Sequence, residues 1–261
     1  MNARVHILGC GTSGGVPQLH VGWGSCDPLE PKNRRSRASI LIEYAGQSLL
    51  VDTTPECRIQ LEHHDVERIS ALLYTHTHAD HCHGIDETRA ICQARNAALP
   101  TFSLNTFLDD LYQRFPYVWW PLKEGAKGYY KPVLLPNIIT PMQPFDCIGM
   151  TILPMVLDHG FSEVLGFRIG DFAYCTDVVN LSEENFAALE GVKYWVVDSL
   201  RPTPHPTHAH IERTLSWIER IKPVKTYLTH MNGDMDYQAL MQTLPSGIEP
   251  AYDGLSFDFT A

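Results

Sequence analysis

The sequence predicts one layered α/β domain that covers residues 1–261. The chain has 261 residues, of which 44% are hydrophobic and 19% are charged, a balance that is ordinary for a globular protein with a sizeable core. Short apolar runs alternate with segments of helical spacing. Several of these apolar runs end in a histidine or an aspartate, and α/β folds place their sites at such strand ends.

The first half of the chain predicts strands and then helices. In order, we expect strands at 4–8 and 38–54, a helix at 56–66, a strand at 69–75 and helices at 84–98 and 105–115. The long second strand segment turns as a hairpin at Ala45-Gly46. The helix at 105–115 begins with Asn105 or Thr106 as its cap. The strand at 69–75 leads directly to His76.

The second half begins with residues 116–149, which are rich in proline, glycine and aromatic side chains and predict loops with irregular strands. Three successive strands, a capped helix that ends at Gly191, a buried strand, an amphipathic helix and a last strand follow. These elements are expected at 150–160, 164–170, 172–177, 182–191, 193–200, 208–222 and 225–230.

Composition excludes some classes of function. Lysine and arginine total 20 against 30 aspartates and glutamates, a net charge of −10, which does not suit non-specific binding of a nucleic-acid backbone. It leaves room for a small anionic substrate. Seven scattered cysteines without a CxxC pair indicate reduced thiols. The first residues resemble no signal or transit peptide, and no apolar run reaches about 18 residues. We therefore expect a soluble, cytoplasmic protein.

One stretch, LLYTHTHADHCHGIDE at residues 72–87, concentrates histidines around an aspartate. Alternating positions of an extended segment project to one side, and imidazole nitrogens with carboxylate oxygens suit zinc, manganese or iron. The candidate ligands here are His76, His78, Asp80 and His81. Three further candidates each follow an apolar run and precede a loop, namely His159, Asp177 and His230.

THTHADH followed by later DHG, CTD and LTH resembles the metallo-β-lactamase superfamily, whose fold is an αββα sandwich of two mixed sheets flanked by helices. The resemblance implies two divalent metal ions, zinc or manganese, with iron also compatible. His76, His78 and His159 would hold one ion, Asp80, His81 and His230 the other, and Asp177 would bridge them. Asp80 then counts among the catalytic residues as well as the ligands. A hydroxide between the ions would be the nucleophile.

Residues outside the ligand set favour one branch. Exported lactamases usually carry a cysteine in the second metal site, and flavodiiron oxidoreductases carry a glutamate where this chain has His78. The segment LGCGTSGGVP at 8–17 resembles the N-terminal loop of tRNA 3′-processing endonucleases and related phosphodiesterases. It also matches GxGxxG, but a dinucleotide-binding fold requires a helix to begin at Gly14, and Gly15-Val16-Pro17 follows instead.

The segment VVDSLRPTPHPTHAHIE, at 196–212, resembles the region where phosphodiesterase branches carry a general acid. We expect that acid to be His208, at the start of the helix predicted over 208–222. Asp198 would orient His208 and raise its pKa so that it can donate a proton. His205 is the alternative acid, although Pro204 and Pro206 favour a rigid loop around it, and it is also a candidate for substrate binding.

Little sequence separates His159 from Asp177, so the long basic arm of the tRNA endonucleases is missing there. The chain resembles more the compact cyclic phosphodiesterase subgroup of the phosphonate carbon–phosphorus lyase pathway, within the tRNase Z-like branch, which opens a phosphoribosyl cyclic phosphate. Only Cys26 remains of the early cysteines that bind an extra zinc in that subgroup. A third, structural zinc is therefore not expected.

The expected function is hydrolysis of a small phosphodiester, such as a cyclic phosphoribosyl one. The basic run KNRRSRAS, at 32–39, is either a solvated loop or a phosphate-recognising edge, for which Arg34, Arg35 or Arg37 are the candidates. A nuclease acting on RNA or DNA ends, a glyoxalase-type thioesterase and a metal-dependent binder without turnover remain alternatives. We expect no nucleic-acid partner and no membrane contact. The aromatic run at 117–122 belongs either to the core or to a homodimer contact.

Overall fold

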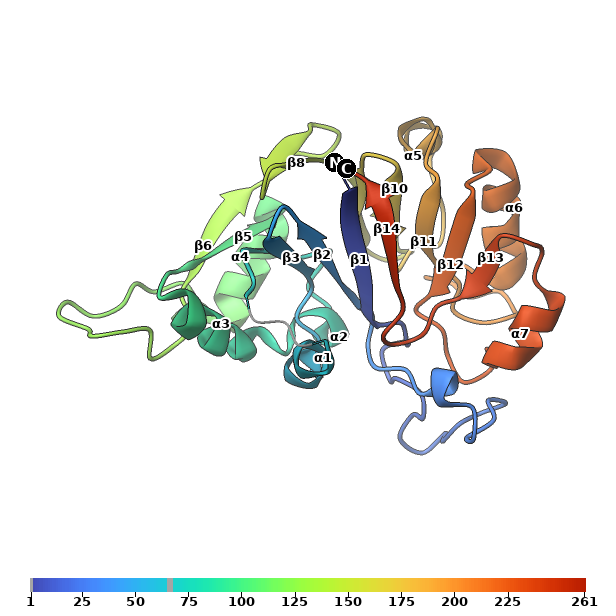
Figure 1. Cartoon of the computed structure of the whole chain (residues 1–261), viewed down its shortest axis with the longest axis horizontal. Helices are drawn as coiled ribbons and strands as arrows, with labels where there is room; N and C mark the ends of the chain where they lie inside the picture. Colours follow the sequence, from blue (N-terminus) through green and yellow to red (C-terminus); the bar gives the residue numbers. More distant parts are fainter. Residues whose placement is uncertain (1, 65–67) are drawn as a thin grey trace.

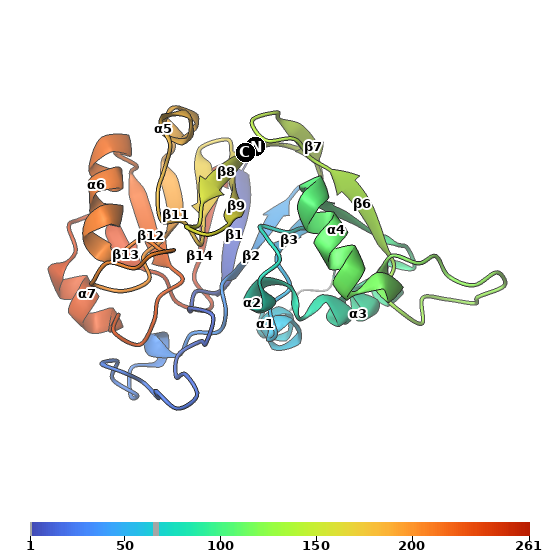
Figure 2. The ribbon, with the colours of Figure 1, turned by 180° about the vertical axis from the view of Figure 1, so that it is seen from behind.

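Two seven-stranded sheets pack face to face, and helices cover their outer faces (Figure 1). The computed structural model describes residues 2–64 and 68–261. In Figures 1 and 2 the helices α1 to α4 lie beside the sheet built by the first half of the chain, and α5 to α7 lie beside the other. The predicted αββα sandwich is confirmed.

The first sheet has the order β14-β1-β2-β3-β4-β5-β6. Its strands pair antiparallel from β14 to β3 and parallel from β3 to β6. The strands are β1 (Asn2–Gly9), β2 (Ser39–Tyr44), β3 (Gln47–Val51), β4 (Ala71–Leu73), β5 (Leu99–Ser103), β6 (Leu134–Ile138) and β14 (Ser256–Thr260).

The second sheet has the order β13-β12-β11-β10-β9-β8-β7. It is parallel from β13 to β10 and antiparallel from β10 to β7. Its strands are β7 (Phe145–Cys147), β8 (Met150–Asp158), β9 (Glu163–Ile169), β10 (Phe172–Cys175), β11 (Tyr194–Asp198), β12 (Lys225–Thr229) and β13 (Ile248–Pro250).

The helices are short and lie between strands. They are α1 (Cys57–His63), α2 (Ala79–Cys82), α3 (Thr88–Arg95), α4 (Asn105–Arg114), α5 (Glu183–Leu189), α6 (Ile211–Ile221) and α7 (Tyr237–Thr243). Single 3₁₀ turns occupy Pro31–Asn33, Ile85–Glu87 and Pro116–Val118. No helix begins after the glycines of 9–15, where the described chain runs in turns and bridges as far as Pro31. The dinucleotide-binding interpretation is therefore excluded.

Alternation along the strands builds the two layers of core. Ile40 and Ile42 of β2 are buried in the core that the two sheets share, whereas Leu41 between them is buried in a second core that also contains side chains of α1 and α3. Successive side chains of a strand point to opposite faces. An apolar run without polar gaps therefore marks a strand buried on both sides.

The parallel halves of both sheets direct their carboxyl ends to one edge of the sandwich. The chain leaves β4 toward His76, β10 toward Asp177 and β12 toward His230. Residues that follow parallel strands meet at the same edge of a sheet. The predicted ligands therefore converge although they are far apart in the sequence.

Several element predictions need correction at their ends. The helix expected over 208–222 begins at Ile211, because the backbone just before it is bonded elsewhere: Ala209 N donates to Val178 O at 2.7 Å. The N-cap of α4 is Leu104, without a side-chain hydrogen bond. The helix expected at 56–66 is α1, and residues 65 and 66 lie outside the described part. The hairpin turn at Ala45-Gly46 and the Ser182 cap of α5 are confirmed.

Two findings concern membranes and thiols. No helix in residues 2–64 and 68–261 is long and apolar enough to cross a membrane. All seven cysteines are free and buried, in agreement with the reduced thiols that the sequence predicts.

Candidate metal centre

Seven histidine and aspartate side chains gather at the strand ends, and they fall into the two groups that the sequence predicts. His76, His78 and His159 have ligand atoms within 4.8 Å of one another. The same holds for Asp80, His81, Asp177 and His230. His78 is exposed at the opening, and the others are buried.

Asp177 lies between the two groups. Its Oδ2 is 3.2 Å from His81 Nε2, and its Oδ1 is 3.3 Å from His230 Nε2. Oδ1 is also 4.0 Å from the Nε2 atoms of His76 and His159. One carboxylate thus faces both groups, which is the position required of a bridging ligand.

The residues fit divalent metal ions. Among the described residues, the buried Nε2 atoms of His76, His81 and His230 have no hydrogen-bond partner. Buried polar atoms are nearly always satisfied, and unsatisfied ones point to an ion or a ligand. Three unpartnered imidazole nitrogens that face carboxylates form a donor set suited to zinc, manganese or iron.

The opposite nitrogen of three ligand rings is held by the protein. Nδ1 of His81 lies 2.8 Å from Asp52 Oδ2, and Nδ1 of His76 lies 2.9 Å from Thr75 Oγ1. His159 Nδ1 donates to the carbonyl oxygen of Thr207 at 2.8 Å. A fixed Nδ1 sets the ring orientation and leaves Nε2 for a metal.

The electric field at the cluster attracts cations. Burial lowers the pKa of His81, but the carboxylates of Asp177, Asp80 and Asp52 outweigh that effect and raise this pKa well above 6.5. Burial and repulsion from His81 hold the pKa of His76 well below 6.5. The carboxylates thus stabilise positive charge in their midst, which a bound metal ion supplies in place of a proton.

The backbone is strained at three of these positions. Asp52, Asp177 and His230 adopt φ angles of 67°, 55° and 57°. Residues other than glycine rarely adopt the left-handed region, and such strain concentrates at functional sites. The loops after β3, β10 and β12 therefore turn sharply to direct these side chains into the cluster.

His208 and Asp198 adjoin the cluster as a bonded pair. His208 Nδ1 is 2.7 Å from Asp198 Oδ2, and the His208 ring stacks on that of His230 at 4.6 Å. A ring nitrogen of His208 also lies within 4.8 Å of the ligand atoms of His159 and Asp177. Asp198 ends β11, and His208 lies in the loop before α6 rather than in the helix.

The expectation that Asp198 raises the pKa of His208 is corrected. Burial lowers the pKa of His208, and burial raises the pKa of Asp198 well above its usual value. Both effects favour the uncharged pair, in which one proton lies on the 2.7 Å contact and one on Nε2. In such an uncharged pair, with Asp198 holding a proton toward Nδ1, the ring proton of His208 is on Nε2.

The remaining predicted site residues lie apart from the seven ligands. His205 Nδ1 accepts from Thr207 Oγ1 at 3.2 Å, and the His205 ring is 5.3 Å from that of His208. Arg34 is exposed. Arg37 pairs with Glu56.

Arg35, one of the three candidate arginines, has its guanidinium bonded within the protein. It is only 2% exposed, and its guanidinium donates to Met235 O at 2.6 Å and to Asn232 O at 3.3 Å. Arg35 thus links the 34–37 segment to the loop after His230 from inside the protein. A dense basic run usually predicts solvated side chains, and the burial of one member could not be read from it.

The region from β3 to the loop after β12 matches a known family. The model of the β-lactamase superfamily domain covers residues 47–231, which include every predicted ligand. The chain belongs to the metallo-β-lactamase superfamily. Membership of this superfamily, together with a cluster of side chains that could hold metal ions, supports a metal-dependent hydrolase.

Relatives within this superfamily cover the chain at several distances. A diphosphatase of the PhnP family is 31% identical, with a TM-score of 0.91 over 99% of this chain and 98% of its own. Zinc-bound PqqB from Methylobacterium extorquens is 18% identical, with a TM-score of 0.76 over 98% and 100% of the two chains. The short form of human tRNase Z is 12% identical, with a TM-score of 0.68 over 97% and 98%. The last two show the shared fold alone.

Another relative is named for the transfer of an acyl group. An octanoyltransferase of Porphyromonas gingivalis (strain ATCC BAA-308 / W83) is 31% identical over 255 residues. These cover 97% of this chain and 51% of the relative. The chain thus spans about half the length of that protein.

Two residues that support the superfamily's ligand loop were not singled out from the sequence. Asp52 bonds His81 directly and receives Thr75 Oγ1 at 2.7 Å. Arg114, at the end of α4, donates to the carbonyl oxygen of Thr77 and lies 3.1 Å from His83 Nε2. Asp52 follows an apolar run, as Asp177 and Asp198 do, and this pattern in the sequence could have pointed to it. Arg114 carries no signal, because its contact depends on how α4 packs.

Replacing Asp52 with asparagine should weaken metal binding. The amide keeps the size of the side chain but replaces one carboxylate oxygen, which now accepts hydrogen bonds, by an NH2 group that can only donate. We expect the dissociation constant for zinc, measured by competition with a chelator, to rise roughly 10–100-fold. The exposed Asp146→Asn serves as the control. Unchanged zinc affinity in Asp52→Asn would show that Asp52 does not orient His81.

Proposed function

We propose that this chain hydrolyses a small phosphodiester, with a cyclic phosphoribosyl phosphate as one member of the substrate class. The observation that carries the proposal is the contact between a metal-binding cluster and a proton-bearing histidine. His208 stacks at 4.6 Å on His230 and is held by Asp198 at 2.7 Å. A diester needs both activation of water and a proton for its leaving oxygen.

The ligands in this mechanism are the seven side chains of the two groups. His76, His78 and His159 would hold one divalent ion, Asp80, His81 and His230 would hold a second, and Asp177 would contact both. Divalent ions bound there would lower the pKa of a water molecule to ~7 and withdraw charge from a phosphoryl oxygen. The orienting contacts of Asp52, Thr75 and Thr207 keep the rings in place while this charge changes.

The proton comes from the His208–Asp198 pair. As the bond from phosphorus to the leaving oxygen breaks, that oxygen takes the proton from His208 Nε2. The proton shared with Asp198 then stays on Nδ1, so the pair ends as a neutral imidazole beside a carboxylate. Asp198 is fully buried, and this fixes the tautomer that can accept the next proton.

The diphosphatase relative supports hydrolysis at phosphorus rather than acyl transfer. It aligns over 98% of its own chain, whereas the octanoyltransferase aligns over only 51% of its own. The nuclease alternative has less support. The net charge is −10, and β8 and β9 join through a short turn where the tRNA endonucleases were expected to carry a basic arm. A homodimer through the aromatic run at 117–122 remains a prediction, with Trp120 exposed and Val118 buried in that run.

A substrate panel tests the proposal. We expect the metal-loaded protein to turn over bis(p-nitrophenyl) phosphate faster than p-nitrophenyl phosphate, an octanoyl thioester or a single-stranded oligonucleotide. A preference for the thioester would place the chain with the thioesterases and overturn the proposal. Oligonucleotide turnover that falls steeply with salt would instead favour the nuclease.

A further inference from the structure

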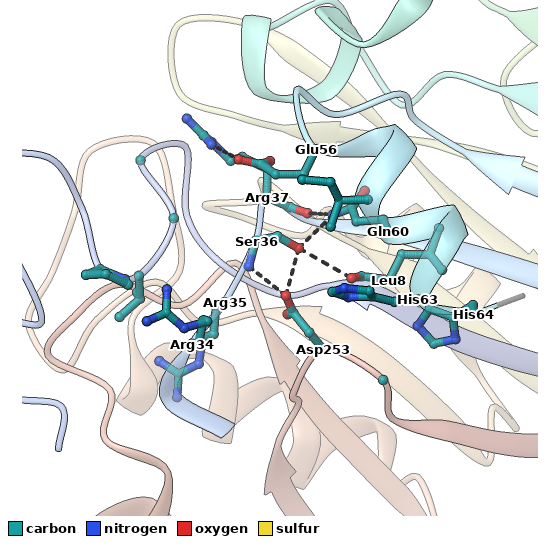
Figure 3. Close-up of a pocket in the computed structure, with 16 residues that line it drawn as sticks. Leu8, Arg34, Arg35, Ser36, Arg37, Glu56, Gln60, His63, His64 and Asp253 are labelled. Carbon is teal, nitrogen blue, oxygen red and sulfur yellow. Dashed lines mark hydrogen bonds and ion pairs between the residues drawn. The ribbon is translucent and has the colours of Figure 1, made fainter. Parts of the chain in front are cut away.

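A cavity of about 740 Å³ lies between α1, the loop at 14–17 and the segment at 34–37 (Figure 3). None of the seven metal-ligating side chains lines it. Its volume falls within the range of about 300–1,000 Å³ that is typical of small-molecule sites. We refer to it as the arginine–histidine cavity, after Arg34, Arg35, Arg37, His63 and His64 in its lining.

Two segments run directly from the metal centre to this cavity. Thr12 N donates at 3.1 Å to the carbonyl oxygen of Met231, the neighbour of His230, and Gly14, two residues on, lines the cavity. Two residues of chain reach at most about 7 Å. Thr53 N donates at 2.8 Å to the carbonyl oxygen of His81, and Glu56, three residues on, also lines the cavity. These two segments link the lining of the cavity to the residues around the metal centre.

The charge of the lining departs from that of the chain. The chain carries a net charge of −10, yet the lining holds three arginines against the carboxylates of Glu56 and Asp253. Both carboxylates already have partners: Glu56 pairs with Arg37, and Asp253 accepts from Ser36 N and Oγ at 2.7 Å each. A locally positive pocket on an acidic protein attracts anions.

Arg34 is the arginine that is available to such an anion. Its side chain is exposed and lies over the Trp23 ring at 5.0 Å. In the described part of the chain it forms no ion pair. A guanidinium that is stacked on an aromatic ring keeps its N–H fork free for a phosphate.

The histidines form the other end of the cavity. Figure 3 shows His63 and His64 on the side away from the arginines. The seven residues of α1, Cys57–His63, rise by about 10 Å. Ile59, on the same helix, is 44% exposed and also lines the cavity. Imidazole rings beside apolar carbon suit a flat nucleobase, which stacks on aromatic side chains.

We propose that the arginine–histidine cavity binds the nucleotide part of a phosphodiester whose scissile phosphorus lies at the metal centre. Arg34 contacts the second phosphate, and His63 and His64 contact the base. Hydrolysis adds one water: its hydroxyl bonds to the scissile phosphorus, the bond to the nucleotide oxygen breaks, and that oxygen takes the proton. This inference rests on the proposed function and narrows its substrate class to nucleotide esters.

The test places a negative charge in the cavity. Ile59→Glu introduces a carboxylate at a partly exposed position, and the matched control Ile138→Glu does so on β6, where Ile138 is 65% exposed. We compare kcat/KM for diadenosine diphosphate with that for methyl p-nitrophenyl phosphate, a diester without a nucleotide. The ratio of the two values should fall about tenfold or more in Ile59→Glu and stay constant in Ile138→Glu.

Binding of AMP to the same proteins gives a readout apart from turnover. Calorimetry should show weaker binding of AMP to Ile59→Glu and to Arg34→Gln than to the wild type, and unchanged binding to Ile138→Glu. Two results would overturn the proposed subsite: equal losses of kcat/KM on both substrates, or AMP binding that is unchanged in Ile59→Glu and Arg34→Gln. If the wild type fails to hydrolyse methyl p-nitrophenyl phosphate but the variants weaken AMP binding, the proposed function fails and the nucleotide site stands.

Discussion

Asp177→Asn should lose metal and activity together. Asp177 is 2% exposed and is the carboxylate that faces both ligand groups, at 3.2 Å from His81 and 3.3 Å from His230. The amide keeps the shape of the side chain but removes the negative charge that both groups share. We expect zinc affinity to fall by more than the ~10–100-fold that is typical of residues which only orient a ligand.

Turnover of bis(p-nitrophenyl) phosphate should fall in proportion to the metal that is lost. Metal content is measured by mass spectrometry after dialysis, and circular dichroism verifies that the variant folds. Asp146→Asn, at an exposed carboxylate of β7, controls for the loss of a charge. A folded Asp177→Asn protein that keeps both its metal and its turnover would contradict the bridging role.

His208→Ala should separate the two properties that Asp177→Asn removes together. His208 contacts the cluster through ring stacking, but Asp198 holds its Nδ1 at 2.7 Å, so it is not needed as a ligand. Metal content should stay at the wild-type level. Turnover of a diester with an alkoxide leaving group should fall roughly 10²–10⁴-fold, as for the loss of a general acid.

The leaving group decides whether His208 acts as an acid. A p-nitrophenolate leaves without a proton, so its release should suffer much less in His208→Ala than release of an alkoxide. His205→Ala is the matched variant, because His205 is the alternative acid and lies 5.3 Å from His208. Equal losses of turnover for both leaving groups would show that His208 is not the acid. A larger loss in His205→Ala would assign that role to His205.

The sequence predicts which side chains gather at the sheet edge because their positions follow from local patterns. Each of His76, Asp177 and His230 comes just after an apolar run, and parallel strands carry such residues to one edge of a sheet. The partition into two groups came from the family resemblance, and the structure reproduces it in the positions of the side chains.

The parts that sequence reasoning missed depend on contacts between distant segments. His208 was expected at the start of a helix because the residues after it have helical spacing. Instead, Ala209 N bonds Val178 O, and α6 starts only at Ile211. Arg35 belongs to a basic run but is buried against the loop after His230. The arginine–histidine cavity likewise forms only when α1 packs beside the 34–37 segment.

The central claim is a dinuclear centre that hydrolyses phosphodiesters, and a metal titration tests it most directly. Metal-free protein is titrated with zinc or manganese while bound metal per chain and turnover of bis(p-nitrophenyl) phosphate are recorded together. The account predicts that turnover reaches a plateau at about two ions per chain. A plateau at one ion, or diester turnover that does not depend on metal, would contradict it.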